Sequence, residues 1–315
     1  MAQGKLDRNI LIPNIFYSLL VFGFASASFM DDQPYCALRY RRLCQGKGRH
    51  VGCQYPYPGP GAGCQNYTQI KFTARLRHFI ISYINRRRQR IAAGTERVRG
   101  GALIPKPQIM MMVVWDRELA LLAQRLADQC SFIHDDCRAT VRYPYSGQTV
   151  GEVRWRASSV SDALSAQRAV RRVLDAWWGE RRRVTPAQLV APFRGRPMSS
   201  SSAWGHFSQL AVWQLAAAGC GAARHGSPPR LLLVCDFSHT NMLGQSTLVA
   251  GEAAPCPPRF GRRSRAYPLL CAPVRGILGF LFFFFLSFFV TACCTLLYLT
   301  NKSLISKIFT IISDL

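Results

Sequence analysis

His206, Glu180 and Ser208 are the residues of this chain whose types suggest catalysis. His206 stands in Gly205-His206-Phe207 and is followed by an apolar run that ends at Trp213, so an ionisable group lies among core-like residues. A histidine or carboxylate can act as a general base, and a serine hydroxyl is a potential nucleophile. The sequence has no Gly-x-Ser-x-Gly elbow and no evident Asp-His-Ser constellation. A single histidine among apolar residues is more often a buried structural residue, whose ring nitrogens form hydrogen bonds, than a catalytic one.

Two stretches resemble the two signatures of the CAP superfamily, which comprises cysteine-rich secretory proteins, antigen 5 and plant pathogenesis-related proteins. The first is residues 205–213, followed by Gly219-Cys220-Gly221, and the second is residues 232–237, followed by 240–245. Residues 85–94 and 130–138 resemble the insect antigen-5-like branch, and residues 115–120 are similar to the family in general. Where that branch usually has His-Asn, this chain has Ile84-Asn85. The resemblance covers roughly residues 36 to 251.

The resemblance implies an α+β fold, which is a three-layer α-β-α sandwich (the CAP, or SCP, domain) with a central groove and a disulfide-rich N-terminal extension. In that family two histidines and two acidic residues line the groove and can hold a divalent metal. The matching positions here are His134, Gln148, Glu180 and His206. Gln148 is a neutral amide where the family usually has glutamate, and Glu152 is a candidate substitute outside the motif.

The loss of one carboxylate at Gln148 weakens the attraction of the groove for a cation. We therefore expect that no cofactor is required and that zinc binds no tighter than about micromolar. Gln148→Glu should tighten that binding. The favoured alternative is that these side chains form a hydrogen-bonded polar cluster that ties helix, loop and strand together.

For function, the resemblance implies a secreted protein that is not an enzyme, because the family consists mostly of allergens, ion-channel ligands and carriers of sterols or fatty acids. We expect an antigen-5-like binding protein of the venom or salivary type, with a small lipid, a sterol or an extracellular protein as its ligand. The alternative is a metal-assisted hydrolase that uses His134, Glu180 and His206.

The strong positive charge raises the question of an anionic partner. The 315 residues include 40 Lys and Arg against 16 Asp and Glu, which gives a formal net charge of +24. Nucleic acid, heparan-like sugar and acidic lipid are the partners that such a charge suggests. No nucleic-acid-binding motif accompanies the charge, so we expect a solvated basic surface and no nucleic acid partner.

Both ends of the chain carry targeting signals. Residues 1–27 have the pattern of a signal peptide, with a basic start, an apolar core and Ala25-Ser26-Ala27 before the cleavage point. Near the other end, residues 276–299 form a predicted transmembrane segment, in which Ile277 to Leu299 carries no charge. As a helix that run would be about 34 Å long, enough for a bilayer core of about 30 Å. A short basic tail, residues 300–315, would follow. The alternative is that this end is absent from the mature protein.

Cysteines are concentrated in the N-terminal extension, residues 28–69, among Gly, Pro and Tyr. Secretion favours disulfides there, while the competing zinc site lacks a Cys-x-x-Cys pair. The family pairing, placed on this sequence, joins Cys36 to Cys53, Cys44 to Cys137, Cys64 to Cys130 and Cys220 to Cys235. Cys256 and Cys271 remain in a Pro- and Arg-rich tail, residues 252–275, and are expected to pair. Asn66-Tyr67-Thr68 is a glycosylation sequon.

Hydrophobic periodicity predicts the main elements of the CAP-like domain, residues 70–251. Apolar residues at three- and four-residue spacing predict helices over 70–94, 111–130 and 170–181. Leu231 to Phe237 is an apolar run typical of a buried strand. Residues 100–108, 186–202 and the segment that ends at Gly147-Gln148-Thr149 are predicted to be loops.

Overall fold

A computed structural model of the chain describes residues 34–156, 165–195 and 201–273. The predicted signal peptide at 1–27 and the predicted transmembrane segment at 276–299 lie outside these residues. Among the described residues, no helix is both long and apolar enough to cross a membrane.

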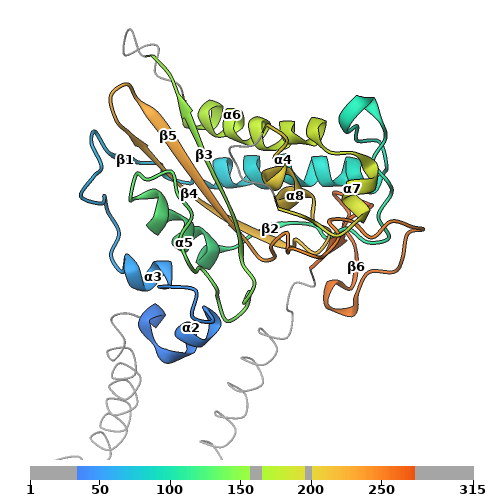
Figure 1. Cartoon of the computed structure of the whole chain (residues 1–315), viewed down its shortest axis with the longest axis horizontal. Coiled ribbons are helices and arrows are strands. Elements are labelled where there is room, and N and C mark those ends of the chain that lie inside the picture. The colour runs from blue at the N-terminus through green and yellow to red at the C-terminus, as the bar shows by residue number, and fades with distance from the viewer. Residues whose placement is uncertain (1–33, 157–164, 196–200, 274–315) are drawn as a thin grey trace, which may run out of the picture. The chain divides into compact units, whose positions relative to one another are not determined.

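A five-stranded sheet forms the middle layer (Figure 1). Its order is β1 (Thr68–Gln69), β4 (Ala217–His225), β5 (Arg230–Phe237) and β3 (Gly147–Arg154), all antiparallel to their neighbours. The short β2 (Val114–Trp115) pairs parallel with β4. Both β4 and β5 are buried along almost their whole length, because both faces of the sheet are covered. The strand predicted at 231–237 is confirmed as part of β5.

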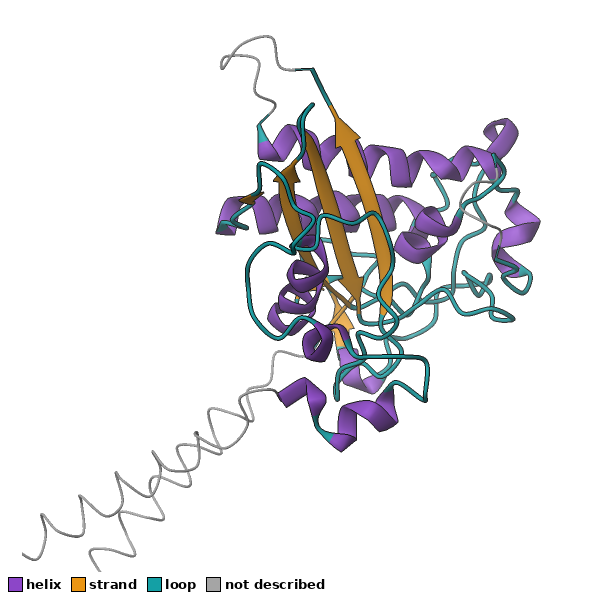
Figure 2. Ribbon diagram, turned by 60° about the vertical axis from the view of Figure 1, so that its left-hand side comes forward, coloured by secondary structure: helices purple, strands orange, loops and turns teal. Residues whose placement is uncertain are grey.

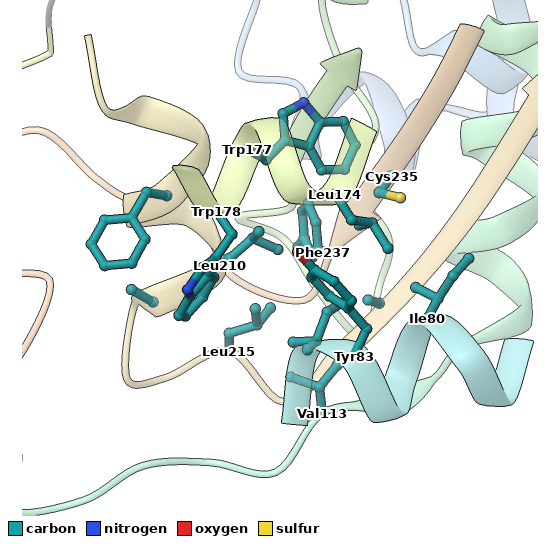
Figure 3. Close-up of a cluster of buried hydrophobic side chains, with 14 of the residues drawn as sticks. Ile80, Tyr83, Val113, Leu174, Trp177, Trp178, Leu210, Leu215, Cys235 and Phe237 are labelled. Atoms are coloured by element: carbon teal, nitrogen blue, oxygen red, sulfur yellow. The ribbon is translucent and has the colours of Figure 1, made fainter. Parts of the chain in front are cut away.

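Helices cover the two faces of this sheet (Figure 2). On one face lie α4 (Ala74–Ala92), α6 (Ala166–Gly179) and α8 (Gly205–Ala211), and on the other lies α5 (Arg117–Ala127). Figure 3 shows the larger core, where Ile80 and Tyr83 of α4 meet Leu174 and Trp178 of α6. The smaller core packs Leu122 and its neighbours on α5 against the sheet. The expected α+β, three-layer architecture is confirmed.

The helices differ from the predicted ones mainly at their beginnings. The helix predicted over 70–94 is α4, which begins after its N-cap Thr73, because Ile70 N–H already donates to Ala222 O of the sheet. The helix predicted over 111–130 begins only at Arg117, after the N-cap Asp116. Residues 111–115 are extended instead, because the sheet and its neighbouring loop accept their N–H groups, as when Val114 N–H donates to Ala216 O. The predicted 170–181 helix is α6, which is followed by the 3-10 turn η5 (Glu180–Arg183).

Some predicted loops contain regular structure. The connection at 186–202 holds the short α7 (Pro186–Val190), whose start is closed by a capping box between Thr185 and Gln188. Gly147-Gln148-Thr149 is the first part of β3 rather than the end of a loop.

Disulfides attach the N-terminal extension to the sandwich. The extension contains η2 (Pro34–Cys36), α2 (Leu38–Leu43) and α3 (Val51–Gln54). Its four cysteines form Cys36–Cys53, Cys44–Cys137 and Cys64–Cys130, and these pairs are those of the family pattern. The zinc alternative therefore has no free thiolates in this segment.

The segment of residues 252–273 packs on the sandwich. It contains η6 (Pro258–Phe260), β6 (Arg262–Arg263) and β7 (Cys271–Ala272), closed by Cys256–Cys271. Cys271 N–H donates to Met110 O, Met112 N–H donates to Cys271 O, and Leu270 is fully buried in the core. The described residues up to Ala272 therefore belong to the same compact unit.

Candidate functional site

His206 and Glu180 form one half of the predicted groove cluster. His206 lies in the first turn of α8 and Glu180 begins η5, directly after α6. His206 Nδ1 lies 2.8 Å from Glu180 Oε1, and the backbone N–H of Phe207 donates to Glu180 Oε2 at 3.1 Å. The ring of His206 also stacks on Trp177, with centroids 5.7 Å apart. Glu180 thus fixes the orientation of the imidazole and satisfies a free backbone donor at the start of α8.

His134 and Gln148 form the other half. His134 Nδ1 lies 2.7 Å from Gln148 Oε1, while Gln148 Nε2 donates to Asp135 Oδ2 at 2.6 Å and to Asp236 Oδ1 at 2.9 Å. His134 is exposed at the surface, whereas both aspartates are buried. The partial burial of the imidazole, and secondarily the nearby Arg138, lower the pKa of His134. The ring is therefore neutral at physiological pH.

Two buried carboxylates lie behind Gln148, and sequence reasoning assigned neither of them a role. Arg138 Nε is 2.8 Å from Asp135 Oδ1 and 3.9 Å from Asp236 Oδ1, so one guanidinium serves both. Burial, and then the charge of Asp135, raise the pKa of Asp236 well above its ordinary value. Asp236 Oδ2 is buried and has no hydrogen-bond partner among the described residues. The only signals in the sequence were that Asp135 adjoins His134 and that Asp236 ends a strand.

These residues do not form a three-ligand metal site. No group of three or more His, Cys, Asp or Glu side chains converges on a metal-sized space in the described part of the chain. The donors that remain are two imidazoles, since Glu180 is bonded to His206, and Gln148 contributes a neutral amide. His206 Nε2 is buried and, like Asp236 Oδ2, has no hydrogen-bond partner among the described residues.

Glu152 does not replace the missing acid. It lies on β3, where its carboxylate contacts Arg154 Nε at 2.7 Å, His225 Nε2 at 3.7 Å and Arg230 at 3.8 Å. These partners are at the opposite end of β3 from Gln148, as the pairing of Arg154 with Arg230 shows. Sequence distance was misleading here because four residues span about 13 Å in a strand.

Ser208 is not placed to act as a nucleophile with His206. Its side chain is fully buried, and its hydroxyl donates to Gly205 O at 2.9 Å and accepts from Asn241 Nδ2 at 2.5 Å. Asn241 N–H in turn donates to Gln209 Oε1, and Gln209 Nε2 donates to His239 O. These bonds join α8 to the loop after β5, so the polar residues of the two signature stretches hold the fold around His206.

Arg88 and Asn85 of α4 bind backbone groups of neighbouring segments, and neither has a hydrogen bond to His134, Gln148, Glu180 or His206. The guanidinium of Arg88 is completely buried and donates to five backbone carbonyls, those of Met111, Leu210, Val212, Trp213 and Leu215. Burial lowers the pKa of Arg88 to about 9, so it stays charged at neutral pH. Asn85 exchanges two hydrogen bonds with the backbone of Val113.

The remaining predicted sites lie apart from the groove cluster. Cys220 and Cys235 are cross-strand partners on β4 and β5 and form a disulfide. Asn66 is exposed in the loop before β1, where a glycan would meet solvent.

Comparison with known proteins identifies the family of the chain. The profile of the cysteine-rich secretory protein family, CAP, matches residues 81–237. Venom allergen 3 of Solenopsis invicta is 30% identical over 208 residues, which are 62% of this chain and 81% of that protein. Venom allergen-1 of Aedes aegypti is 27% identical over 269 residues, which are 79% of this chain and 98% of that protein. The chain therefore belongs to the CAP family, and its relatives include proteins named venom allergen and antigen 5.

Solved structures support the fold. A crystal structure of NaASP2 with Zn²⁺ superposes with a TM-score of 0.50 at 21% identity, covering 68% of this chain and all of that one. A crystal structure of Na-ASP-1 gives a TM-score of 0.52, also at 21% identity, and covers 69% of this chain and 51% of that one.

Proposed function

We propose that this chain acts outside the cell as an antigen-5-like binding protein and not as an enzyme. The observation that carries the proposal is that the polar side chains of the groove cluster are bonded to one another. Glu180 is engaged by His206 and Phe207, Gln148 by His134 and two aspartates, and Ser208 by Asn241. A general base or nucleophile must present a free atom to a substrate, and the free atom of the histidine–glutamate pair, His206 Nε2, is buried.

An apolar ligand, such as a small lipid or sterol, fits the surface beside this cluster. Phe132 and Ile133 directly precede His134, and each is more than half exposed. Large apolar side chains that remain exposed together mark interaction sites more often than single ones do. An extracellular protein with an apolar contact patch is the other ligand that this surface would accept.

The test is to purify the secreted protein and identify bound small molecules by mass spectrometry. Phe132→Ser/Ile133→Ser is expected to lose the bound lipid while folding normally. The matched control is Leu38→Ser/Tyr57→Ser, which removes two exposed apolar side chains from the N-terminal extension. Equal lipid content in all three proteins would count against the proposed surface.

Metal-assisted hydrolysis is the second candidate, and the unpartnered Nε2 of His206 is the observation that favours it. With only two imidazole donors, we expect zinc to bind weakly at His134 and His206 and to support no turnover. Hydrolysis that EDTA abolishes, and that Glu180→Gln removes, would replace the binding function with this one.

We also propose that residues 1–27 direct secretion, that Asn66 is glycosylated, and that residues 277–299 anchor the chain if the mature protein retains them. Carbonate extraction of membranes from expressing cells tests the anchor. Full-length chain, with its C-terminal peptides, found only in the soluble medium would contradict it. A shift in mobility after glycosidase treatment, absent in Asn66→Gln, tests the glycan.

A further inference from the structure

A cavity of about 420 Å³ lies between α4, α6 and η5, and its lining is unusually basic. None of the groove residues His134, Gln148, Glu180 or His206 lines it. Five arginines do, two acidic residues accompany them, and Trp178 contributes an apolar wall; the arginines are Arg86, Arg87, Arg90, Arg181 and Arg182. The lining therefore carries an excess of three positive charges.

Two carboxylates hold three of these arginines in place. Glu96, whose side chain is 3% exposed, lies 3.1 Å from Arg90 Nε and 2.9 Å from Arg181 Nε. Asp175 lies 3.2 Å from an amino group of Arg87 and accepts from the hydroxyl of Tyr83 at 2.6 Å. The guanidinium of Arg87 also lies over the Tyr83 ring, 3.2 Å from its centroid. Arg87 and Arg181, whose side chains are 26% and 24% exposed, are thereby restricted before any ligand arrives, which lowers the entropic cost of binding.

The other two arginines of the cavity are available to bind an anion. Arg86 and Arg182 are exposed, and neither makes an ion pair with any residue in the described part of the chain. Guanidinium groups present planar pairs of N–H donors that match the oxygens of a phosphate group. Several such groups around one concave surface also concentrate the positive potential there.

We propose that this cavity binds a ligand that carries two or more phosphate groups, either free in solution or as the head group of a lipid. The excess of three positive charges calls for a multiply charged anion rather than a single phosphate. The volume lies within the range of about 300–1,000 Å³ typical of small-molecule sites. An open cavity of this size suits a compact phosphate ester better than an extended polyanion, which would need a long basic track.

The experiment is calorimetric titration of tripolyphosphate into the full secreted chain. Arg86→Ala/Arg182→Ala is expected to weaken binding by about tenfold or more, because both charge-assisted contacts are lost. The matched control is Arg41→Ala/Arg42→Ala, which removes two exposed arginines from α2 and should leave affinity unchanged. If the control variant loses affinity to the same extent, the attraction is a non-specific effect of the +24 charge and the proposal is overturned. The proposal is also overturned if the wild-type chain binds neither tripolyphosphate nor vesicles that contain a bisphosphorylated phosphoinositide.

Glu96→Gln distinguishes binding to a preorganised site from binding that depends only on net charge. This substitution makes the cavity more positive but releases Arg90 and Arg181 from their shared carboxylate. A preorganised site predicts weaker tripolyphosphate binding, whereas stronger binding would mean that affinity follows net charge and would overturn the proposed site. Thermal unfolding checks that the variant is folded, and the Arg86/Arg182 pair carries the test if it is not.

Vesicles distinguish the two sources of the phosphate groups. Phosphatidylcholine vesicles with and without a bisphosphorylated phosphoinositide are sedimented with the wild-type chain. Binding that requires the phosphoinositide, and that Arg86→Ala/Arg182→Ala reduces, supports a lipid head group as the ligand. Tripolyphosphate binding without vesicle binding supports a soluble ligand.

Discussion

Gln148 on β3 and Asp236 on β5 are cross-strand partners, and Gln148 Nε2 donates to Asp236 Oδ1 at 2.9 Å. The same amide nitrogen donates to Asp135 at 2.6 Å. The neutral side chain at this position therefore separates two buried carboxylates and satisfies an oxygen of each. A glutamate here would have no hydrogen to donate and would bring a third negative charge into the cluster.

Gln148→Glu is expected to destabilise the protein by about 2 kcal/mol in the presence of EDTA, because two hydrogen bonds are lost and like charges meet. Zinc should restore part of this loss, since a cation relieves the repulsion and binding to the folded state stabilises it. Urea unfolding with EDTA and with zinc measures both effects. Gln54→Glu, at an exposed position, is the control and should change neither. Equal stability of Gln148→Glu and wild type in EDTA would contradict the prediction.

Asp236→Asn is expected to change how stability depends on pH. Burial, and then Asp135, raise the pKa of Asp236 in the folded state. The stability linked to this group is therefore full below its unfolded pKa of about 3.9 and is lost as pH rises through the higher folded value. The variant should lack this loss, so its stability relative to wild type should improve from about pH 4 towards neutrality. Urea unfolding across that range provides the measurement, and parallel pH profiles would count against the assignment.

His50 should make the N-terminal extension sensitive to acid. Its Nε2 donates to Ala139 O at 2.8 Å, while Nδ1 accepts from the N–H of Gly52 at 3.1 Å, so only the neutral ring satisfies both partners. Burial lowers the pKa of His50 in the folded state. The stability that His50 contributes is thus present above its unfolded pKa of about 6.5 and is lost as pH falls.

Limited proteolysis of the extension as a function of pH tests this expectation. Cleavage near residues 34–54 should rise below about pH 6 in wild type. His50→Gln should be more labile at neutral pH and lose most of the pH dependence. His78→Gln, which changes an exposed histidine on α4, should behave as wild type does. A His50 resonance that titrates at or above the ordinary pKa would refute the assignment.

The Cys44–Cys137 disulfide should contribute more to stability than Cys36–Cys53. The first spans 93 residues and fastens the extension to the sandwich, whereas the second spans 17 within the extension. Removing the first pair as Cys44→Ala/Cys137→Ala is expected to cost about 2–5 kcal/mol, because the closed loop is long. The second pair should cost less, and urea unfolding of the two double variants gives the comparison. The reverse order would argue against loop closure as the cause.

Elements with a local hydrophobic pattern were predicted from the sequence, whereas elements that depend on packing against a distant part of the chain were not. The apolar face of α4 follows from residues such as Ile80 and Ile84, and it was predicted because helical periodicity is local. Strand β4 was not predicted, because its alanines and glycines show no alternation. Its Gly219 and Gly221 leave room for the backbone of α5, and a side chain at either position would overlap that helix. That requirement arises only when the two elements pack.

In the candidate site, too, some residues could be predicted from the sequence and others only from the packing. His134, Gln148, Glu180 and His206 could be named from a family resemblance, and the structure brings them into two hydrogen-bonded pairs. Asp135 and Asp236 could not be named, because a buried carboxylate looks like a solvated one in sequence. The cavity arginines looked like a charged surface for the same reason, and only their shared partners Glu96 and Asp175 distinguish them.

Arg88 is expected to be the most sensitive charged position of the fold. Its guanidinium donates to five backbone carbonyls and has no carboxylate partner among the described residues. Arg88→Met should leave these carbonyls buried without donors, at a cost of more than about 3 kcal/mol. Arg88→Lys should also destabilise, but less, because an ammonium group supplies three donors in place of five.

Urea unfolding of the two variants, with Arg86→Met as a control on the same helix, measures these costs. The control should lie within about 0.5 kcal/mol of wild type, because Arg86 is exposed and makes no ion pair with a described residue. A loss of stability would also loosen α8, since two of the five carbonyls belong to Leu210 and to Val212, which ends that helix. The position of the His206 ring should then become less fixed, so we expect the NMR resonance of His206 to broaden in Arg88→Lys. If Arg88→Met is as stable as the control, the five bonds do not hold the fold as described.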